Sequence, residues 1–319
     1  MKLSIRSVKS VPRFISASLL ILNLFSPPYA QQPSLDKKLF SAIGQNDLLS
    51  VERLIREGAN IEGRETNGMT PLMDAAEHGN VPLLSLLLES GAKPNVKDEQ
   101  GETALSWAAR GGWVREVSLL AILSDAAAKN HALFEAIRGG PVGIAVVDAN
   151  LPGPPQPQPS EVVESWTATV EELIARGADL EARSEDDSTP LLEAAAYAKT
   201  DIFKLLMEKG AHLNVKDKYG NTPLLAAACQ CAVATMNNAD EVIQILLDSG
   251  ADVNARNHDG ETVLMMASGM SGDASVLGLL LRYHANPEAK DRKGMTALAI
   301  ARKSFRDDKI AILNKVSTR

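Results

Sequence analysis

Two kinds of apolar segment alternate along most of this chain. One is a short phrase of Thr, Pro, Leu and paired Ala, as in TPLMDAA at 70–76 and TPLLAAA at 222–228. The other has apolar residues at three- and four-residue spacing, as in VPLLSLLLES at 81–90 and DIFKLLMEKG at 201–210. This spacing is typical of a helix with one buried face. Because Thr caps a helix and Pro suits its first turn, the pattern predicts pairs of short helices and an all-α fold.

A third phrase follows most of the second segments. It begins with Gly-Ala and continues into Asn or Asp, as in GAKPNVKDE at 91–99 and GAHLNVKDK at 210–218. Gly ends a helix at low strain because it adopts the left-handed conformation. The residues expected in this conformation are Gly58, Gly91, Gly177, Gly210 and Gly250. Asn and Asp then favour a turn, so each helix pair is expected to lead into a projecting turn, which we call a finger.

The Thr that starts the first phrase recurs at a fixed interval. Thr70 and Thr103 are 33 residues apart, and so are Thr189 and Thr222. This period and phrase resemble the ankyrin-repeat family, whose T-P-L-H-x-A motif is matched in three places, each with the His replaced. These places are 70–75, 189–194 and 222–227. The resemblance covers about residues 34–319 and implies an all-α ankyrin-repeat solenoid of stacked helix-turn-helix units with β-turn fingers.

About eight units are expected within one repeat domain at 31–319. Their bounds are 34–65, 66–98, 99–128, 129–184, 185–217, 218–257, 258–291 and 292–319. The segment SDAAAKN at 124–130 replaces the Gly-Ala phrase, and a Pro-rich insertion lies near 139–160. We therefore expect the stack to be interrupted near 124–165, which would leave a short amino-terminal array and a longer carboxy-terminal one. A smaller insertion is expected around 231–238.

The first thirty residues differ from the rest of the chain. Four cations and no acid precede or flank an apolar run at 14–25, which is shorter than the roughly 20 residues that span a bilayer. This arrangement is typical of a secretory signal peptide at 1–30 with cleavage after Ala30, although an uncleaved anchor is the alternative. We therefore expect an exported, bacterial-type protein, periplasmic or secreted, without a membrane span after cleavage.

Composition and charge narrow the class of partner. The chain is 45% hydrophobic and 23% charged, which is typical of folded proteins, and its 4% aromatic content suits packed helices. Its formal charge is −7, and removal of the four cations in residues 1–30 makes it −11. An acidic protein repels a phosphate backbone, so nucleic acid is not expected as a partner.

No catalytic constellation is apparent in the sequence. The nucleophile elbow, phosphate-binding loop and zinc-helix motifs are all missing, and the five His residues are isolated from one another along the chain. Cys229 and Cys231 are too close in sequence to bridge within one helix or strand. An enzyme site within the insertion would have only Asp148, Glu161 and Glu164. We therefore expect no enzyme activity, no cofactor and no metal.

The resemblance implies that a protein partner binds the finger tips and the inner, concave face of the first helices. The residues at these positions are Thr66, Asn67, Met69, Glu77, His78, Glu99, Gln100, Glu102, Arg110, Glu185, Asp186, Ser188, Tyr197, Lys218, Tyr219, Asn221, Gln230, His258, Asp259 and Glu261. Tyr197, Tyr219 and Met69 are the expected anchors, because such side chains bury much area on binding. The expected function is a monomeric, non-enzymatic scaffold of the periplasm or cell exterior. The alternative is a secreted effector that acts on a host or competitor protein.

Overall fold

The computed structural model describes residues 32–139, 159–230, 238–269 and 274–317. The predicted signal peptide at 1–30, most of the Pro-rich insertion, and Cys231 with the smaller insertion lie outside these residues. The described part forms sixteen helices without a strand, which confirms the predicted all-α fold. None of these helices is both long and apolar enough to cross a bilayer.

The helices alternate between a first and a second helix of each unit. The first helices are α1 (Gln32–Gly44), α3 (Pro71–Glu77), α5 (Ala104–Arg110), α7 (Ala126–Arg138), α9 (Pro190–Ala196), α11 (Pro223–Gln230), α13 (Val263–Gly269) and α15 (Ala297–Lys303). The second helices are α2 (Leu48–Arg56), α4 (Val81–Glu89), α6 (Val114–Leu123), α8 (Pro159–Ala175), α10 (Thr200–Glu208), α12 (Asn238–Asp248), α14 (Ser275–Arg282) and α16 (Asp307–Ser317).

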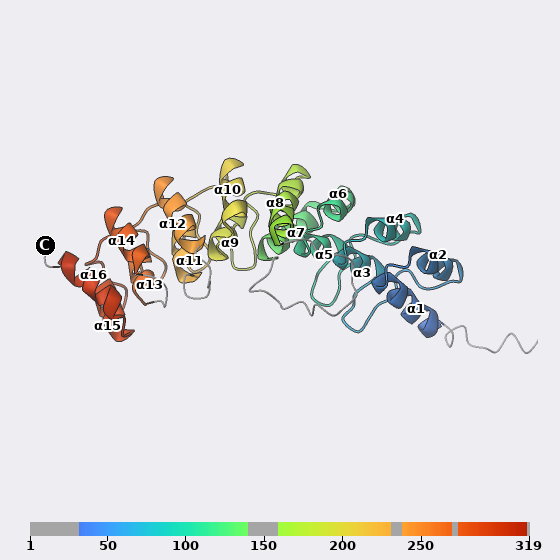
Figure 1. Cartoon of the computed structure of the whole chain (residues 1–319), viewed down its shortest axis with the longest axis horizontal. Helices are drawn as coiled ribbons and strands as arrows, with labels where there is room; N and C mark the ends of the chain where they lie inside the picture. Colours follow the sequence, from blue (N-terminus) through green and yellow to red (C-terminus); the bar gives the residue numbers. More distant parts are fainter. Residues whose placement is uncertain (1–31, 140–158, 231–237, 270–273, 318–319) are drawn as a thin grey trace, which may run out of the picture.

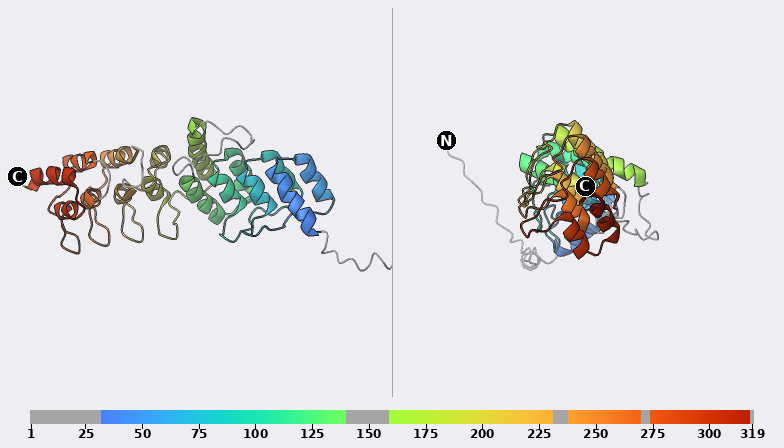
Figure 2. Two further views of the ribbon diagram at one scale, coloured as in Figure 1. Left: turned by 60° about the horizontal axis from the view of Figure 1, so that its bottom comes forward. Right: turned by 90° about the vertical axis from the view of Figure 1, so that its left-hand side faces the viewer.

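The two kinds of helix form two rows along an elongated stack. Each first helix packs against the first helix of the next unit, and the second helices lie in a parallel row (Figure 1). In the left view of Figure 2 the fingers of the carboxy-terminal units project on the side opposite to the second helices. This arrangement leaves one side of each first helix, together with the fingers, free to face a partner.

Local capping explains why the first helices begin where they do. Thr70 Oγ1 accepts a hydrogen bond from the Met73 amide at 3.4 Å, and Thr189 Oγ1 accepts one from the Leu192 amide at 3.3 Å. The Gly residues that end the second helices have the expected left-handed backbone, for example Gly91 with φ of 99°. Both features were predicted from the repeated phrases, and the structure contains them.

The core is continuous along the stack, so the expected interruption near 124–165 is wrong. Buried apolar residues from Leu39 to Leu313 form one cluster. Helix α7 packs against α5 on one side and α9 on the other, and α8 packs against α6 and α10. These two helices fill the place of one complete unit, and they pack against each other.

Residues 124–130 replace the Gly-Ala phrase, as the sequence indicated, and they form no finger. Helix α7 begins among them at Ala126. Asp125 caps this helix, because its Oδ1 accepts a hydrogen bond from the Ala128 amide at 2.8 Å. The helix is therefore 13 residues long, whereas α5 and α9 have 7.

Candidate binding surface

Four of the fingers are held in shape by an Asp or Asn at their base. Asp217 Oδ1 accepts hydrogen bonds from the amides of Tyr219 and Asn221, both at 2.8 Å. The equivalent residues Asp98, Asn257 and Asp291 accept from their own fingers in the same way. Gly220 completes the turn with φ of 82°. The side chains at the tips are therefore presented from a fixed backbone.

Neighbouring fingers are also joined to one another. The Lys218 amide donates to the Asp186 carbonyl at 3.0 Å, and the His258 amide donates to the Tyr219 carbonyl at 2.9 Å. Arg183 adds a side-chain link, because its Nη1 donates to the carbonyls of Asp187 and Lys216 at 2.6 and 3.0 Å. The tips thus form an ordered row along the stack.

The predicted binding residues fall into three groups by exposure. The exposed ones are Thr66, Glu77, His78, Glu99, Gln100, Glu185, Asp186, Tyr197, Lys218, Tyr219, His258 and Asp259. The half-buried ones are Asn67, Arg110, Asn221 and Glu261, and the buried ones are Met69, Glu102 and Ser188. Gln230 ends α11, and its side chain lies outside the described residues.

Met69 is buried, so it is not the exposed anchor that the sequence predicted. It is 5% exposed and belongs to the core cluster. Its amide donates to Asn67 Oδ1 at 3.0 Å, and its carbonyl accepts from the Glu65 amide at 3.0 Å. These bonds turn the backbone back at the base of the finger, so the side chain points into the stack.

Tyr197 and Tyr219 are the exposed aromatic residues of the predicted set. Tyr197 is 42% exposed at the end of α9, and Tyr219 is 54% exposed on the next finger. The seven residues of α9 separate the finger side from Tyr197, a distance of about 10 Å at 1.5 Å per residue. The two rings therefore lie at opposite edges of the inner face.

An ion-pair network occupies the inner face of α5, α7 and α9. Arg110 Nη2 donates to Glu102 Oε1 at 2.7 Å and to Glu135 Oε2 at 2.6 Å. Arg138 continues the network, with Nη1 3.4 Å from Glu135 and Nη2 2.8 Å from Glu193. The Glu102 and Glu135 side chains are only 8% exposed. Because buried carboxylates need partners, this network holds three consecutive first helices together.

His131 is part of the same network, so it is not isolated as the sequence suggested. Its Nε2 lies 2.9 Å from Glu102 Oε2. This hydrogen bond raises the pKa of His131 above its ordinary value, against the effect of burial. Burial by itself would raise the pKa of Glu102, but the hydrogen bonds with His131 and Ser106 and the charges of His131 and Arg110 together lower it.

Sequence analysis identified Glu102 and Arg110 but missed the other members of the network. Glu135 and Glu193 occupy the same position within their repeats, and so do Arg110 and Arg138. Stacking the aligned repeats would have placed each acid beside a base of the neighbouring unit. The alignment of the repeats therefore contains the signal for these pairs.

Two groups of acidic and His residues have the ligand types of a metal site. The ligand atoms of Glu102, His131 and Glu135 lie within 4.8 Å of one another. The guanidinium of Arg110 already bridges these two carboxylates, so it occupies the position that a cation would take. This group is therefore better described as part of the ion-pair network.

The second group, Asp74, Glu77 and His78, lies on α3. His78 Nδ1 is 3.1 Å from Asp74 Oδ1 and 2.8 Å from the Asp74 carbonyl oxygen. The side-chain hydrogen bond with Asp74 raises the pKa of His78 to about 9. A protonated His cannot bind a metal, so His78 acts here as a cation paired with Asp74. It too is not isolated.

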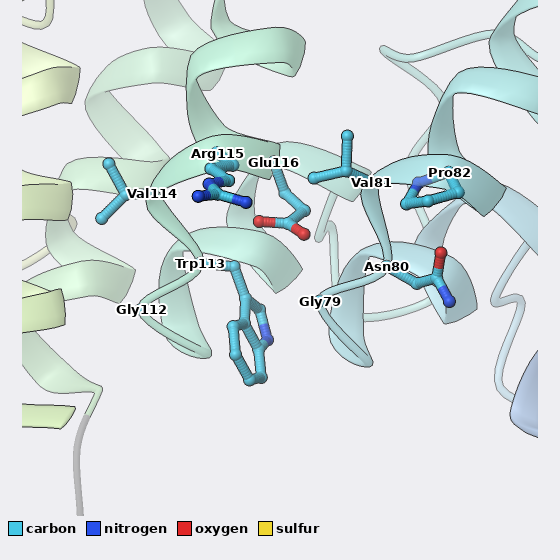
Figure 3. A pocket seen from close by; sticks show the side chains of 9 residues that line it. All are labelled: Gly79, Asn80, Val81, Pro82, Gly112, Trp113, Val114, Arg115 and Glu116. Atoms are coloured by element: carbon cyan, nitrogen blue, oxygen red, sulfur yellow. The ribbon is translucent and has the colours of Figure 1, made fainter. Parts of the chain in front are cut away.

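A hollow of about 430 Å³ lies between the turns that join α3 to α4 and α5 to α6 (Figure 3). It contains none of the predicted binding residues. The Trp113 ring lines it, and Trp113 Nε1 donates to the Glu77 carbonyl at 3.0 Å. This bond connects the turn before α4 to the turn before α6. It therefore joins two neighbouring units at the hollow.

Glu116 is the buried acid of this hollow. It is 4% exposed, and burial raises its pKa, although the amides of Glu116 and Val81 and the charge of Arg115 oppose the shift. Leu83 and Ile202 occupy the equivalent position in their own second helices. The Val81 amide is at the start of α4, so Glu116 satisfies a helix terminus across the unit boundary.

Comparison with known proteins identifies the repeats. A family model described as ankyrin repeats in three copies matches residues 31–98, 163–233 and 231–314. The chain is 30% identical over 164 residues to an ankyrin repeat and KH domain-containing protein of Caenorhabditis briggsae, and 32% identical over 169 residues to the protein mask-1 of Caenorhabditis elegans. Each alignment covers 49% of this chain, but only 5% and 6% of those proteins.

A third relative is the mitochondrial disaggregase of Bos taurus, with 39% identity over 72 residues, which are 22% of this chain and 11% of that protein. The chain thus spans a small part of the length of these relatives. Ankyrin repeats generally mediate contacts between proteins, and proteins built from them are generally non-enzymatic scaffolds. The matched regions cover more than half of the sequence, and the chain belongs to the ankyrin-repeat family.

Proposed function

We propose that this chain is an exported, non-enzymatic scaffold that binds a protein partner through its finger tips and the inner face of its first helices. The observation that carries this proposal is the pair of exposed rings at Tyr197 and Tyr219. Exposed aromatic side chains provide large buried area on binding at little cost in conformational entropy. The ordered row of fingers keeps one of these rings in place before the partner arrives.

The face between the two rings suits close contact with another protein. Small side chains lie on it at Ala196 of α9 and at Ala226 and Cys229 of α11, beside Glu193 of the ion-pair network. Lys218 Nζ lies 5.2 Å from the centre of the Tyr219 ring and pairs with Asp186 of the neighbouring finger. A partner that contacts both rings would therefore cover a face about 10 Å across, with the Lys218–Asp186 pair along its finger edge.

The test removes both rings and asks whether the partner is lost. The chain without residues 1–30 is used to capture proteins from the envelope fraction, and the double variant Tyr197→Ala with Tyr219→Ala is compared with it. We expect the partner to be recovered by the parent chain and lost by the double variant, with unchanged helical circular dichroism. The matched control is Phe305→Ala, since Phe305 is 89% exposed but lies between α15 and α16. Equal capture by all three proteins would overturn the proposal.

The proposed location is the periplasm or the cell exterior, and the proposed state is a monomer. The location rests on the cations and apolar run within residues 1–30, which are typical of a secretory signal. Fractionation of the source cells and the mass of the isolated chain test cleavage after Ala30. Recovery of the chain inside a host or competitor cell would instead assign it to the effector class.

A further inference from the structure

Charge is unevenly distributed along the stack. Residues 31–269 contain 19 Lys or Arg and 35 Asp or Glu, a formal charge of −16. Residues 270–319 contain 10 Lys or Arg and 5 Asp or Glu, a formal charge of +5. The cations therefore concentrate at the carboxy-terminal end, the red end of the stack in Figure 1.

Five of these cations are exposed on the last finger and at the end of the last first helix. They are Lys290, Arg292 and Lys293 on the last finger and Arg302 and Lys303 at the end of α15, and we call them the basic end. Within the described residues none of the five forms an ion pair. Their charges are thus available to a partner.

Several equivalent cations in earlier units are paired with acids of the same chain. Lys218 on an earlier finger pairs with Asp186. Arg110 and Arg138, which occupy the repeat position of Lys303, pair with acids of the ion-pair network. Lys97 and Lys216, at the repeat position of Lys290, also form no ion pair within the described residues, so the last unit differs from these earlier units at the positions of Arg292 and Lys303.

The inner face beside the basic end is apolar. Met266 and Ile300 occupy the repeat position that holds Glu135 and Glu193 in the network. Both are half-buried. A Cβ atom on Gly269 would lie 3.1 Å from Ile300 Cγ2, so the Ile300 side chain lies across the end of α13. The last two first helices thus present an apolar strip next to unpaired cations.

We infer that the basic end and the strip of Met266 and Ile300 bind an acidic polypeptide segment that also carries apolar side chains. Carboxylates of such a segment would complement the five cations, and its apolar side chains would cover the strip. A nucleic acid fits less well, because the whole chain carries −7 and Met266 and Ile300 offer no aromatic surface for base stacking. The inference rests on the proposed protein-binding function and names the chemistry of one partner segment.

The probe is a short fluorescein-labelled peptide of Glu and Leu in a two-to-one ratio, and binding is followed by fluorescence anisotropy. The test variant is Arg292→Glu, Lys293→Glu and Lys303→Glu together. We expect it to bind about tenfold more weakly or worse, which corresponds to about 1.4 kcal/mol. The parent chain should bind an all-Glu peptide more weakly than the Glu-Leu peptide, because the strip then stays uncovered.

The matched control is Lys37→Glu, Lys38→Glu and Lys93→Glu together, which changes the net charge equally at exposed positions of the amino-terminal units. It should bind the probe more tightly than the test variant and keep the same helical circular dichroism. Equal affinity of the two triple variants would overturn the inference. Tighter binding of a single-stranded oligonucleotide of equal charge would also overturn it. So would a dimer of the parent chain that forms without peptide and is lost only in the test variant, because it would assign the surface to a second copy of the chain.

The Tyr197→Ala, Tyr219→Ala double variant separates this inference from the proposed function. It should bind the Glu-Leu peptide like the parent chain, because neither ring belongs to the basic end. Failure of peptide binding together with Tyr-dependent capture would reject the inference and leave the proposed function intact. Peptide binding without Tyr-dependent capture would reject the proposed function and leave the inference intact.

Discussion

Replacement of Arg110 by Met tests whether the ion-pair network stabilises the middle of the stack. The change removes three charge-assisted hydrogen bonds, one to Glu102 and two to Glu135. Each such bond contributes about 1.5–3 kcal/mol. The loss is smaller than their sum, because Glu102 keeps His131, Glu135 keeps Arg138, and Arg110 is 39% exposed to screening solvent. We expect the free energy of unfolding to fall by about 2–3 kcal/mol at neutral pH.

The same variant should show a characteristic pH dependence. Without Arg110, the pKa of Glu102 should rise towards its ordinary value, because one of the charges that lower it is lost. A lowered folded-state pKa contributes stability that is present above the unfolded-state pKa and is lost as pH falls through the folded-state value, so the variant lacks part of this contribution only at the higher pH. The difference from the parent chain should therefore be larger at pH 7.5 than at pH 4.5.

Urea unfolding followed by circular dichroism at both pH values measures the loss, and hydrogen exchange locates it. Faster exchange is expected in α5, α7 and α9, whose side chains form the network. The control is Arg282→Met, an exposed Arg on α14, which should cost less than about 0.5 kcal/mol. A loss at Arg110 that matches this control, or one that is equal at both pH values, would refute the reasoning.

Two further outcomes follow from local geometry. Because the Asp74 carboxylate raises the pKa of His78 to about 9, the stabilisation of the parent chain relative to His78→Gln should be complete below pH 6.5 and disappear as pH rises to 9. Urea midpoints across this range measure it, and a constant difference would contradict it. Gly79→Ala should destabilise by more than Gly294→Ala in the same assay, since a Cβ atom at Gly79 would collide with the Trp113 ring while Gly294, with a similar φ, has open space. Equal costs would show that the ring moves aside freely.

Much of the fold could be predicted because the relevant signals are local. A Thr cap, a Gly terminus and a finger turn each depend on a few neighbouring residues, and these recur every 33 residues or so. The start of α7 escaped prediction for the same reason. Its cap, Asp125, lies outside the repeated phrase, so the sequence indicates that a finger is absent there but not that a longer helix takes its place.

The binding surface was harder to predict because exposure depends on neighbours in space. Met69 has a side chain of the size expected of an anchor. The hydrogen bonds of its amide with Asn67 Oδ1 and of its carbonyl with the Glu65 amide direct this side chain into the core. Glu135 is 25 residues from Arg110, and Glu193 is 55 residues from Arg138. Such pairs become visible only when the repeats are stacked.

The network also bears on where along the stack recognition takes place. From α5 to α9 the inner face carries acids and bases that satisfy one another, and a partner would have to separate them before it could use their charge. From α11 to α15 the positions equivalent to Glu135 and Glu193 hold Ala226, Met266 and Ile300, and the cations of the basic end form no ion pair within the described residues. Substitutions in the network should therefore change stability more than affinity. Substitutions at Tyr219 or the basic end should change affinity more than stability, and we therefore expect the carboxy-terminal half to determine partner specificity.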